Sequence, residues 1–310
     1  MKRSLRVIFM GTPEFAVPSL AAIVGSRHKV VGVITAPDRP SGRGLQVRFS
    51  AVKHYALEHK LKIMQPEKLR SPNFIEDLKS LEADLQVVVA FRMLPEIVWS
   101  MSPLGTFNLH ASLLPQYRGA APINWAVING EEETGVSTFF LQHEIDTGDL
   151  LFQEKVAIGE NETAGELHDH LSALGAGLVL RTVDAIADNN TQSIPQPEMH
   201  IKFAPKISKN DARINWQKSL EEVHNLVRGM NPVPGSWTML DDKVFKIYST
   251  RKELSDHTYT TGKVIIEGEN VMKIALPSGF LQLLEVQMEG KRKMSIPDFL
   301  KGYRGSFNLE

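Results

Sequence analysis

The feature that most constrains this chain is a regular alternation of short apolar runs with helix-like stretches over its first 110 residues. Several runs are uninterrupted Val, Ile and Phe, which is typical of parallel strands covered on both faces. Strands and helices alternating at this spacing predict an α/β fold with a Rossmann-like, doubly wound parallel sheet. The expected strands are 6–10, 30–34, 61–64, 85–91 and 106–110, and the expected helices are 15–26, 49–60 and 72–82.

The pattern changes after this region. Four leucines repeat at helical spacing and predict one amphipathic helix over 163–188. Residues 190–205 contain three prolines and show no periodicity, so we expect a semi-rigid linker there. The first domain is therefore expected to cover 1–189. The leucines in question are Leu167, Leu171, Leu174 and Leu178.

A second domain is expected over 206–310. A predicted helix over 219–228 is followed by five short strand-like segments separated by turn residues, which indicates a small OB-like β-barrel. This region carries 16 Lys and Arg against 13 Asp and Glu. That balance permits contact with nucleic acid, and solvated surface charge explains it equally well. The segments are 236–240, 243–249, 262–267, 271–276 and 280–287.

The composition excludes several classes of protein. With 35 Lys and Arg against 36 Asp and Glu, the chain is not a globally basic nucleic-acid coat. It contains no cysteine, which excludes disulfides, thiolate zinc sites and cysteine nucleophiles and suits a reducing cytoplasm. We find no uninterrupted apolar stretch of about 18 residues, so no membrane span is expected.

The loop after the first strand argues against a dinucleotide cofactor. A nicotinamide or flavin site needs a G-x-G-x-x-G loop whose backbone N–H groups face the pyrophosphate. Here the loop has one glycine, Gly11, and Pro13 has no N–H to donate. A dehydrogenase is therefore disfavoured, and the phosphate-binding G-x-x-x-x-G-K-[ST] motif is also missing from the sequence.

The densest group of reactive residue types follows the strand at 106–110. Asn108 and His110 are two positions apart, so their side chains leave the same face of that strand. They lie at its carboxyl end, where sheets of this type bind ligands. An amide can stabilise a developing oxyanion and an imidazole can move a proton, so the pair fits acyl transfer. A purely structural Asn-x-His pair remains the alternative.

Other residues near this pair have more than one interpretation. A turn at 144–149 supplies carboxylates, one of which can orient His110. His110, His143 and Asp146 can also imitate a metal site of two histidines and one carboxylate, although no pattern of spacing supports it. Ser112 lacks the G-x-S-x-G context of a nucleophile, and Leu113 to Pro115 have the character of a wall that lines a ligand. The loop 37–44, with Arg39 and Arg43, is a basic surface loop or a plain connection.

Taken together, these strings resemble the folate-dependent formyltransferases. The resemblance covers nearly the whole chain and is strongest toward the members that act on charged tRNA. It begins at Gly11-Thr12-Pro13-Glu14-Phe15 and extends through Asn231-Pro232-x-Pro234-Gly235-x-Trp237 in the second domain. The central strings are Asn108-x-His110-x-Ser112-Leu113-Leu114-Pro115, Tyr117-Arg118-Gly119-Ala120-Ala121-Pro122 and Asp146-Thr147-Gly148-Asp149.

The resemblance implies an activity and a set of residues. It implies transfer of the formyl group of 10-formyltetrahydrofolate to the α-amine of methionine on initiator tRNA, by a cytoplasmic monomer that needs no metal. It implies a catalytic triad of Asn108, His110 and Asp146. It assigns the folate site to Phe91, Ser112, Leu113, Leu114 and Pro115, and tRNA contacts to Phe15, Arg39 and Arg43.

The sequence differs from the family pattern at one place, and two alternative functions stay open. Many members read Ala-aromatic-Gly before Leu-Pro, whereas this chain has Ala90-Phe91-Arg92-Met93-Leu94-Pro95, one residue shorter and with Arg92 in place of Gly. A formyltransferase for another amine, such as an amino-sugar nucleotide, shares the same triad and is the nearest alternative. A non-catalytic RNA-binding protein is the alternative of another class, and the intact triad disfavours it.

Overall fold

The computed structural model describes residues 3–41, 46–199 and 201–309. By their internal contacts the residues form two compact units that interleave along the sequence. The second unit takes two segments from inside the predicted first domain, and the domain bounds at 189 and 206 stay a prediction. The first unit comprises Met1–Gly119, Gly135–Val156 and His168–Phe203, and the second comprises Ala120–Thr134, Ala157–Leu167 and Ala204–Glu310.

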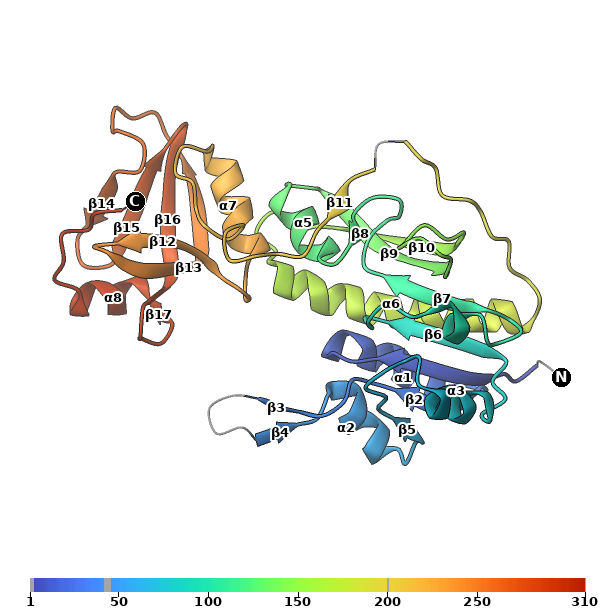
Figure 1. Cartoon of the computed structure of the whole chain (residues 1–310). Coiled ribbons are helices and arrows are strands. Elements are labelled where there is room, and N and C mark those ends of the chain that lie inside the picture. Colours follow the sequence, from blue (N-terminus) through green and yellow to red (C-terminus); the bar gives the residue numbers. More distant parts are fainter. Residues whose placement is uncertain (1–2, 42–45, 200, 310) are drawn as a thin grey trace. The chain divides into compact units, whose positions relative to one another are not determined.

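The first unit is built on a seven-stranded sheet with the order β10-β9-β7-β6-β1-β2-β5 (Figure 1). The five predicted strands are present and pair in parallel, which confirms the Rossmann-like layout. The sequence did not predict β9, which pairs with β7 in antiparallel fashion and makes the sheet mixed. The bounds are β1 Arg6–Gly11, β2 Lys29–Ile34, β5 Ile63–Met64, β6 Leu85–Val89, β7 Thr106–His110, β9 Glu133–Phe140 and β10 Leu150–Ala157.

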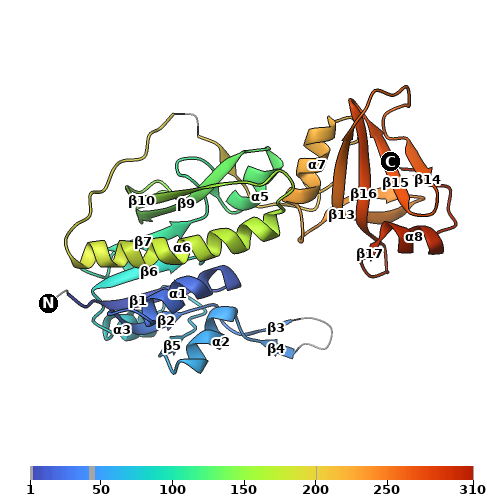
Figure 2. The same ribbon diagram turned by 180° about the vertical axis from the view of Figure 1, so that it is seen from behind.

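Helices cover both faces of this sheet (Figures 1 and 2). On one face, side chains of β1 and β6 pack with α3 and α4 in a buried apolar cluster. On the other face, α6 lies so close to β7 that a Cβ at Gly175 would come within 2.6 Å of Leu109. The bounds are η1 Glu14–Ala16, α1 Val17–Val24, α2 Ala51–Glu58, α3 Pro72–Lys79, α4 Glu96–Trp99 and α6 Ala164–Ala187. The helix α5, Pro122–Ile128, belongs to the second unit.

The helix α6 confirms the long helix predicted over 163–188. By length and composition alone it is long and apolar enough to cross a membrane. Half of its most apolar window is buried inside the protein. The Thr182 hydroxyl lies 2.9 Å from that of Thr138 in β9, as fits a helix of the core. Length and apolar composition are shared by core helices and membrane spans.

The second unit contains a six-stranded antiparallel sheet, ordered β12-β13-β16-β15-β14 with β17 paired to β16. All five predicted strands are present, whereas closure into an OB-like barrel stays a prediction. The helix predicted over 219–228 is α7. The bounds are α7 Leu220–Gly229, β12 Ser236–Leu240, β13 Lys243–Leu254, β14 Val264–Glu267, β15 Val271–Leu276, β16 Gly279–Met288, β17 Met294–Ser295 and α8 Ile296–Gly302.

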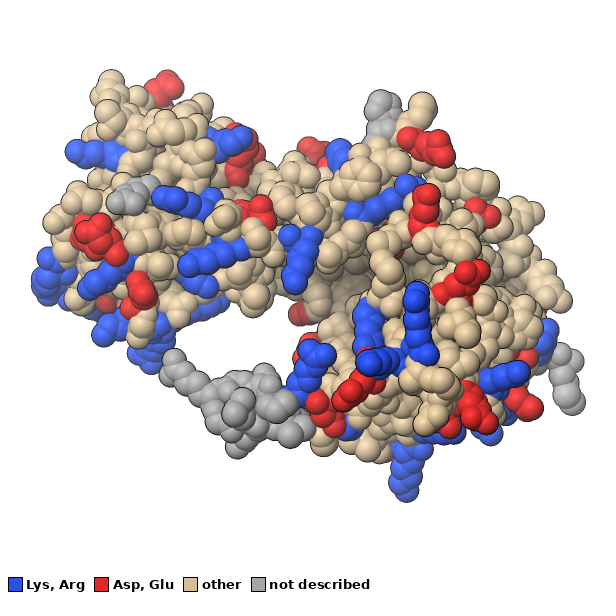
Figure 3. Space-filling view, in the orientation of Figure 1, with Lys and Arg blue, Asp and Glu red and all other residues tan. Residues whose placement is uncertain are grey.

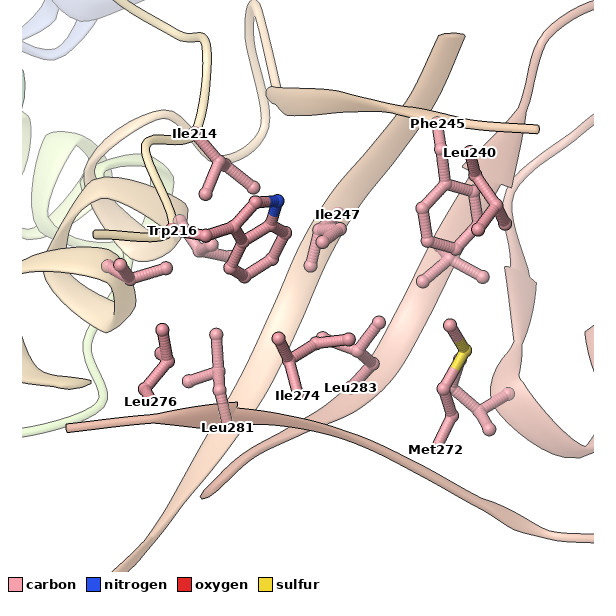
Figure 4. Close-up of a cluster of buried hydrophobic side chains, with 14 of the residues drawn as sticks. Ile214, Trp216, Leu240, Phe245, Ile247, Met272, Ile274, Leu276, Leu281 and Leu283 are labelled. Atoms are coloured by element: carbon pink, nitrogen blue, oxygen red, sulfur yellow. The ribbon is translucent and has the colours of Figure 1, made fainter. Parts of the chain in front are cut away.

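The core of the second unit lies between this sheet, the segments that precede it and α8, which follows it. Figure 4 shows Trp216 facing the apolar side chains of the strands, among them Ile247 and Leu281. The indole N–H of Trp216 donates to the Thr238 hydroxyl at 3.1 Å, so the ring is buried without an unpaired donor. Alternate residues of β12, β13 and β16 are buried, as period-two packing requires.

The helix α7 starts at a capping box, in which Ser219 and Glu222 each bond the other's backbone N–H. Hydrogen bonds from Lys218 and Ser219 lower the pKa of Glu222 to about 2. The capping box therefore starts α7 directly after Ser219, where the predicted helix 219–228 also begins.

Two further strand pairs are short. β3 (Arg39–Ser41) pairs with β4 (Gln46–Arg48), and β8 (Arg118–Gly119) pairs with β11 (Phe203–Ala204). The predicted linker is held by contacts within the first unit at several points: Ile194 forms an antiparallel bridge with Leu150, and Gln196 is buried.

Candidate active site

The end of β7 places Asn108 and His110 in the sheet. Asn108 lies opposite Val88 of β6 and Phe139 of β9, and it is half-buried. His110 is 6% exposed. On the same face of the strand, the Thr106 hydroxyl donates to the Trp99 carbonyl at 2.5 Å, which shows that this face is turned toward α4. The alternation predicted from the sequence therefore brings the amide and the imidazole to one face.

A backbone carbonyl fixes the orientation of the His110 ring. Nε2 lies 2.8 Å from the carbonyl oxygen of Tyr117, which can only accept, so Nε2 carries a proton and donates it. Nδ1 is consequently the ring atom left for chemistry. Tyr117 has a φ of +58°, a left-handed conformation that few residues other than glycine adopt.

Asp146 faces that free nitrogen. Its Oδ2 lies 3.9 Å from His110 Nδ1, and both side chains are largely buried. The same oxygen accepts a hydrogen bond from the backbone N–H of Gly119 at 3.0 Å. Residues 117–119 therefore hold both partners, because Tyr117 bonds the imidazole and Gly119 bonds the carboxylate.

The sequence reasoning missed Gln196 and Arg118. The Gln196 amide donates to the carbonyls of Asp146 at 2.9 Å and Gly148 at 2.8 Å. Its oxygen accepts from Arg118 Nε at 3.1 Å and Nη2 at 2.7 Å. The proline-flanked Gln196 carries no periodic signal, and only its setting in Pro195-Gln196-Pro197, a stretch of rigid extended backbone, marks it out.

The predicted folate residues after β7 form a buried segment. The Ser112 hydroxyl donates to the Gln116 carbonyl at 2.6 Å, and Ser112 itself is fully buried. Leu114 and Pro115 are buried and Leu113 is half-buried. The backbone of Leu114 is held on both sides, since its N–H donates to Ser137 Oγ and its carbonyl accepts from Gln153.

A hollow of about 490 Å³ opens beyond the carboxyl end of β6. It combines apolar walls with two arginines, and Phe91, also predicted for the folate site, is half-buried at the start of the segment that lines it. Arg92 donates to the carbonyls of Pro66 and Glu67. Burial and the neighbouring positive charge of Arg39 lower the pKa of Arg92. The lining residues are Leu69, Arg70, Arg92, Met93, Leu94, Pro95, Glu96, Trp99 and His143.

The three residues predicted to contact tRNA are placed differently from one another. Arg39 is exposed in β3, and it is near enough to Arg92 for its positive charge to lower the pKa of Arg92. Phe15 is only 6% exposed, and its ring lies edge-on to His168 with centroids 5.2 Å apart. Arg43 lies outside the described residues. The burial of Phe15 disfavours stacking on a base, and a contact of Phe15 with RNA stays a prediction.

The metal-site alternative finds no ligand set in the part of the chain that the structure describes, where no three His, Asp or Glu side chains are grouped to hold an ion. His143 is exposed, and its Nε2 lies 3.5 Å from Glu96 Oε1.

Comparison with known proteins agrees with this architecture. The family model described as "Formyl transferase" matches residues 5–183, and that described as "Formyl transferase, C-terminal domain" matches residues 206–304. The chain is 48% identical to a methionyl-tRNA formyltransferase of Bacteroides fragilis over 311 residues, covering 97% of this chain and 96% of the relative. It is 50% identical to that of Flavobacterium johnsoniae over 303 residues, covering 96% of each.

Solved structures share the fold at lower identity. An N-formyltransferase of Helicobacter canadensis in complex with folinic acid and dTDP-3-aminofucose matches with a TM-score of 0.69 at 20% identity, covering 94% of this chain and all of that one. HypX of Aquifex aeolicus in complex with tetrahydrofolic acid matches with a TM-score of 0.66 at 16% identity, covering 96% of this chain and 47% of that one. The chain belongs to the formyl transferase family, because family models match both of its halves and relatives are 48% to 50% identical over nearly its whole length.

Proposed function

We propose that this chain transfers the formyl group of 10-formyltetrahydrofolate to the α-amine of methionine carried by initiator tRNA, in the cytoplasm. The observation that carries the proposal is a nearly full-length identity of 48% to 50% with methionyl-tRNA formyltransferases. The candidate site supports it, because an amide and an imidazole on one face of β7 with a carboxylate beside them suit acyl transfer.

Asn108 and His110 act on the oxygen of the group that is transferred. Attack of an amine on a formyl carbon places negative charge on that oxygen, and preorganised donors in a buried site stabilise the charge. We assign this role to the Asn108 amide. His110 acts through Nδ1, because Nε2 is bonded to the Tyr117 carbonyl, and Nε2 can still donate to that oxygen once Nδ1 has taken up a proton.

Asp146 supports the charged form of His110. When Nδ1 takes up a proton, the carboxylate 3.9 Å away provides the opposite charge. A strong base is not required, since a free α-amine has a pKa of about 7.7–8.0 and is readily deprotonated near neutrality. His110 or a water molecule therefore suffices to move the proton from the attacking amine to the folate nitrogen, whose bond to the formyl carbon breaks as the new amide bond forms.

The hollow beside β6 suits a folate. Its volume of about 490 Å³ is in the range of pockets for small ligands, about 300–1,000 Å³. Trp99, Leu69 and Leu94 offer apolar surface for a flat aromatic molecule, and Arg70 and Arg92 would bind its glutamate carboxylates. When bound, 10-formyltetrahydrofolate supplies the formyl carbon. Phe91 and the segment Ser112 to Pro115 do not line the hollow, and we assign them to the folate site from the family resemblance alone.

Exposed cations and one aromatic ring in the second unit suit tRNA. Lys209 Nζ lies 5.2 Å and Arg213 Cζ 5.5 Å from the ring centre of the half-buried Trp237. Basic side chains are spread over the visible face of this unit (Figure 3). Such side chains neutralise phosphates, so we assign part of the tRNA contact to them and part to Arg39 and Arg43.

An amino-sugar nucleotide is the alternative acceptor. The Helicobacter canadensis structure holds an aminated sugar nucleotide, but at 20% identity the likeness extends to the fold alone. The methionyl-tRNA formyltransferases that are 48% to 50% identical favour charged tRNA as the acceptor.

Formyl transfer from 10-formyltetrahydrofolate to purified Met-tRNA, with initiator and elongator tRNAs measured side by side, tests the proposal. We expect efficient formylation of the initiator and poor use of the elongator. Equal use of both would retain the enzyme activity and refute initiator selectivity. No transfer to either tRNA, with transfer to an amino-sugar nucleotide, would replace the proposal by its alternative.

A further inference from the structure

A segment of the expected linker, residues 194–199 with 201–202, is bonded to the start of β10 and to the two turns of the candidate site, 116–119 and 146–148. Ile194 and Leu150 exchange two backbone hydrogen bonds, of 2.8 and 2.9 Å. Further along, the Lys202 carbonyl accepts from the Tyr117 N–H at 2.6 Å, and the Lys202 N–H donates to Gln116 Oε1 at 3.1 Å. The segment is therefore anchored on both sides of Gln196 within the first unit.

Gln196 joins these two turns through a carboxamide whose orientation is fixed. It is 9% exposed, its oxygen accepts twice from Arg118, and its nitrogen donates to the carbonyls of Asp146 and Gly148. A flipped amide would turn its NH₂ toward the guanidinium and its oxygen toward two carbonyls. All four contacts therefore favour one orientation.

The turn at 146–148 needs such support. Asp146 has a φ of +56°, a left-handed conformation that is unfavourable for a residue with a Cβ. Gly148 lies against the end of β9, where a Cβ would come within 1.6 Å of the Phe140 carbonyl oxygen. The turn thus rests on β9 on one side and is bonded by Gln196 on the other. Without Gln196, the carbonyls of Asp146 and Gly148 lose these donors, and the left-handed conformation of Asp146 loses the support that they give it.

We propose that Gln196 is a positioning residue of the active site. By holding the backbone of Asp146, it directs the carboxylate to the Gly119 N–H and to His110 Nδ1. Arg118 orients the amide of Gln196, and its neighbour Gly119 bonds the carboxylate directly. The inference rests on the proposed function for the role of Asp146, and it adds that Gln196 of the expected linker positions this carboxylate.

Two substitutions test this in the full chain. Gln196→Glu retains a partner for Arg118 but places carboxylate oxygen against the carbonyls of Asp146 and Gly148. Gln196→Met has a similar volume and removes the hydrogen bonds, so it serves if the charged variant folds poorly. We expect each to lower kcat about 10- to 100-fold, with the KM of folate and of Met-tRNA changed less than about twofold. Gln192→Ala, at an exposed position of the expected linker before Ile194, is the control and keeps kcat.

A double-mutant cycle separates positioning from general destabilisation. If Gln196 acts through Asp146, Gln196→Met causes no further loss of kcat in an Asp146→Ala background. Multiplying losses would overturn the inference, as would a full kcat in both Gln196 variants or a loss confined to KM. Full activity of Asp146→Ala would overturn the catalytic assignment of Asp146 and the inference with it.

A measurement without substrate distinguishes this inference from the proposed function. Hydrogen exchange of the Gly119 amide reports on its bond to Asp146. We expect exchange to accelerate in Gln196→Met while the strands of the sheet stay protected. Unchanged protection at Gly119 would refute the positioning role, even if the wild-type protein proved to formylate a different amine.

Discussion

The backbone N–H of Gly119 lies 3.0 Å from Asp146 Oδ2, and two residues earlier the Tyr117 carbonyl lies 2.8 Å from His110 Nε2. A three-residue stretch therefore sets the position of both the imidazole and the carboxylate that faces it. The distance of 3.9 Å between His110 Nδ1 and Asp146 Oδ2 is thus fixed by backbone groups as well as by the two side chains.

Replacement of Asn108 tests the assignment of the oxyanion donor. We expect Asn108→Ala to lower kcat about 10²–10³-fold, equivalent to roughly 2.7–4 kcal/mol, because a preorganised donor is lost. The KM for Met-tRNA should change little. Steady-state kinetics with Asn190→Ala, an exposed asparagine, as control would measure this. A rise in KM alone would show that Asn108 binds substrate without assisting the reaction.

Removal of a charge from the hollow tests the folate site. Arg70 lines it, and a hydrogen bond to a charged group contributes about 1.5–3 kcal/mol. We therefore expect Arg70→Ala to raise the KM for 10-formyltetrahydrofolate about tenfold or more with kcat nearly unchanged. Lys68→Ala removes a nearby exposed charge that does not line the hollow, and it should leave this KM unaltered. Equal effects of the two variants would count against the assignment.

The salt dependence of tRNA binding tests the cations around Trp237. Each phosphate contact contributes about 1 to the slope of log K against log salt. We expect the double variant Lys209→Ala, Arg213→Ala to bind Met-tRNA more weakly and to reduce this slope by about 2. Folate binding should remain as in the wild type. If the slope matches that of the exposed-site control Lys263→Ala, these cations do not contact the phosphates.

His224 predicts a loss of stability in mild acid. It is 2% exposed with Nδ1 2.9 Å from the Thr250 hydroxyl, and burial with the charges of Lys252 and Arg228 lowers its pKa to about 4. A histidine with a lowered folded pKa stabilises the fold above its unfolded pKa of about 6.5, and this contribution decreases as the pH falls toward 4. We expect a loss of about 2 kcal/mol between pH 7 and pH 5.

Unfolding by urea at the two pH values, for the wild type and His224→Gln, would measure this. In His224→Gln, most of the difference in free energy of unfolding between pH 7 and pH 5 should disappear. His59→Gln, at an exposed position, should retain this difference. The pKa of Glu222 is lowered from 4.5 to about 2, so its contribution to stability changes mainly below pH 5. Identical pH dependence in the wild type and His224→Gln would mean that another group titrates.

The fold could be predicted wherever the spacing of apolar residues in the sequence matches the positions that are buried. Mainly apolar runs such as those of β1 and β6 are buried on both faces, and the five predicted strands of the second unit end at turn residues. The strand β9 was missed because its interior contains Thr134, Ser137 and Thr138, which are buried nonetheless. Ser137 donates to the Ser112 carbonyl, so its polar group has a partner that only the tertiary structure supplies.

The candidate site was predictable only in part. Asn108 and His110 share a face because strand geometry requires it, and the family resemblance pointed to Asp146. Gln196 could not be predicted, because its role depends on four hydrogen bonds to residues 48 to 78 positions away. Local spacing contains no record of such contacts.

The interleaving of the two units limits how this chain can be recombined with its relatives. Within the second unit, the Asn124 amide of α5 donates to the Gly229 carbonyl of α7 at 2.8 Å, and a Cβ at Gly229 would come within 2.5 Å of Ile128. A chimaera joined at residue 205 would pair α5 of one parent with α7 of the other. A chimaera that takes its C-terminal half from a relative would therefore also need residues 120–134 and 157–167 of that relative. The part that must be exchanged as a whole consists of three separate segments of the sequence.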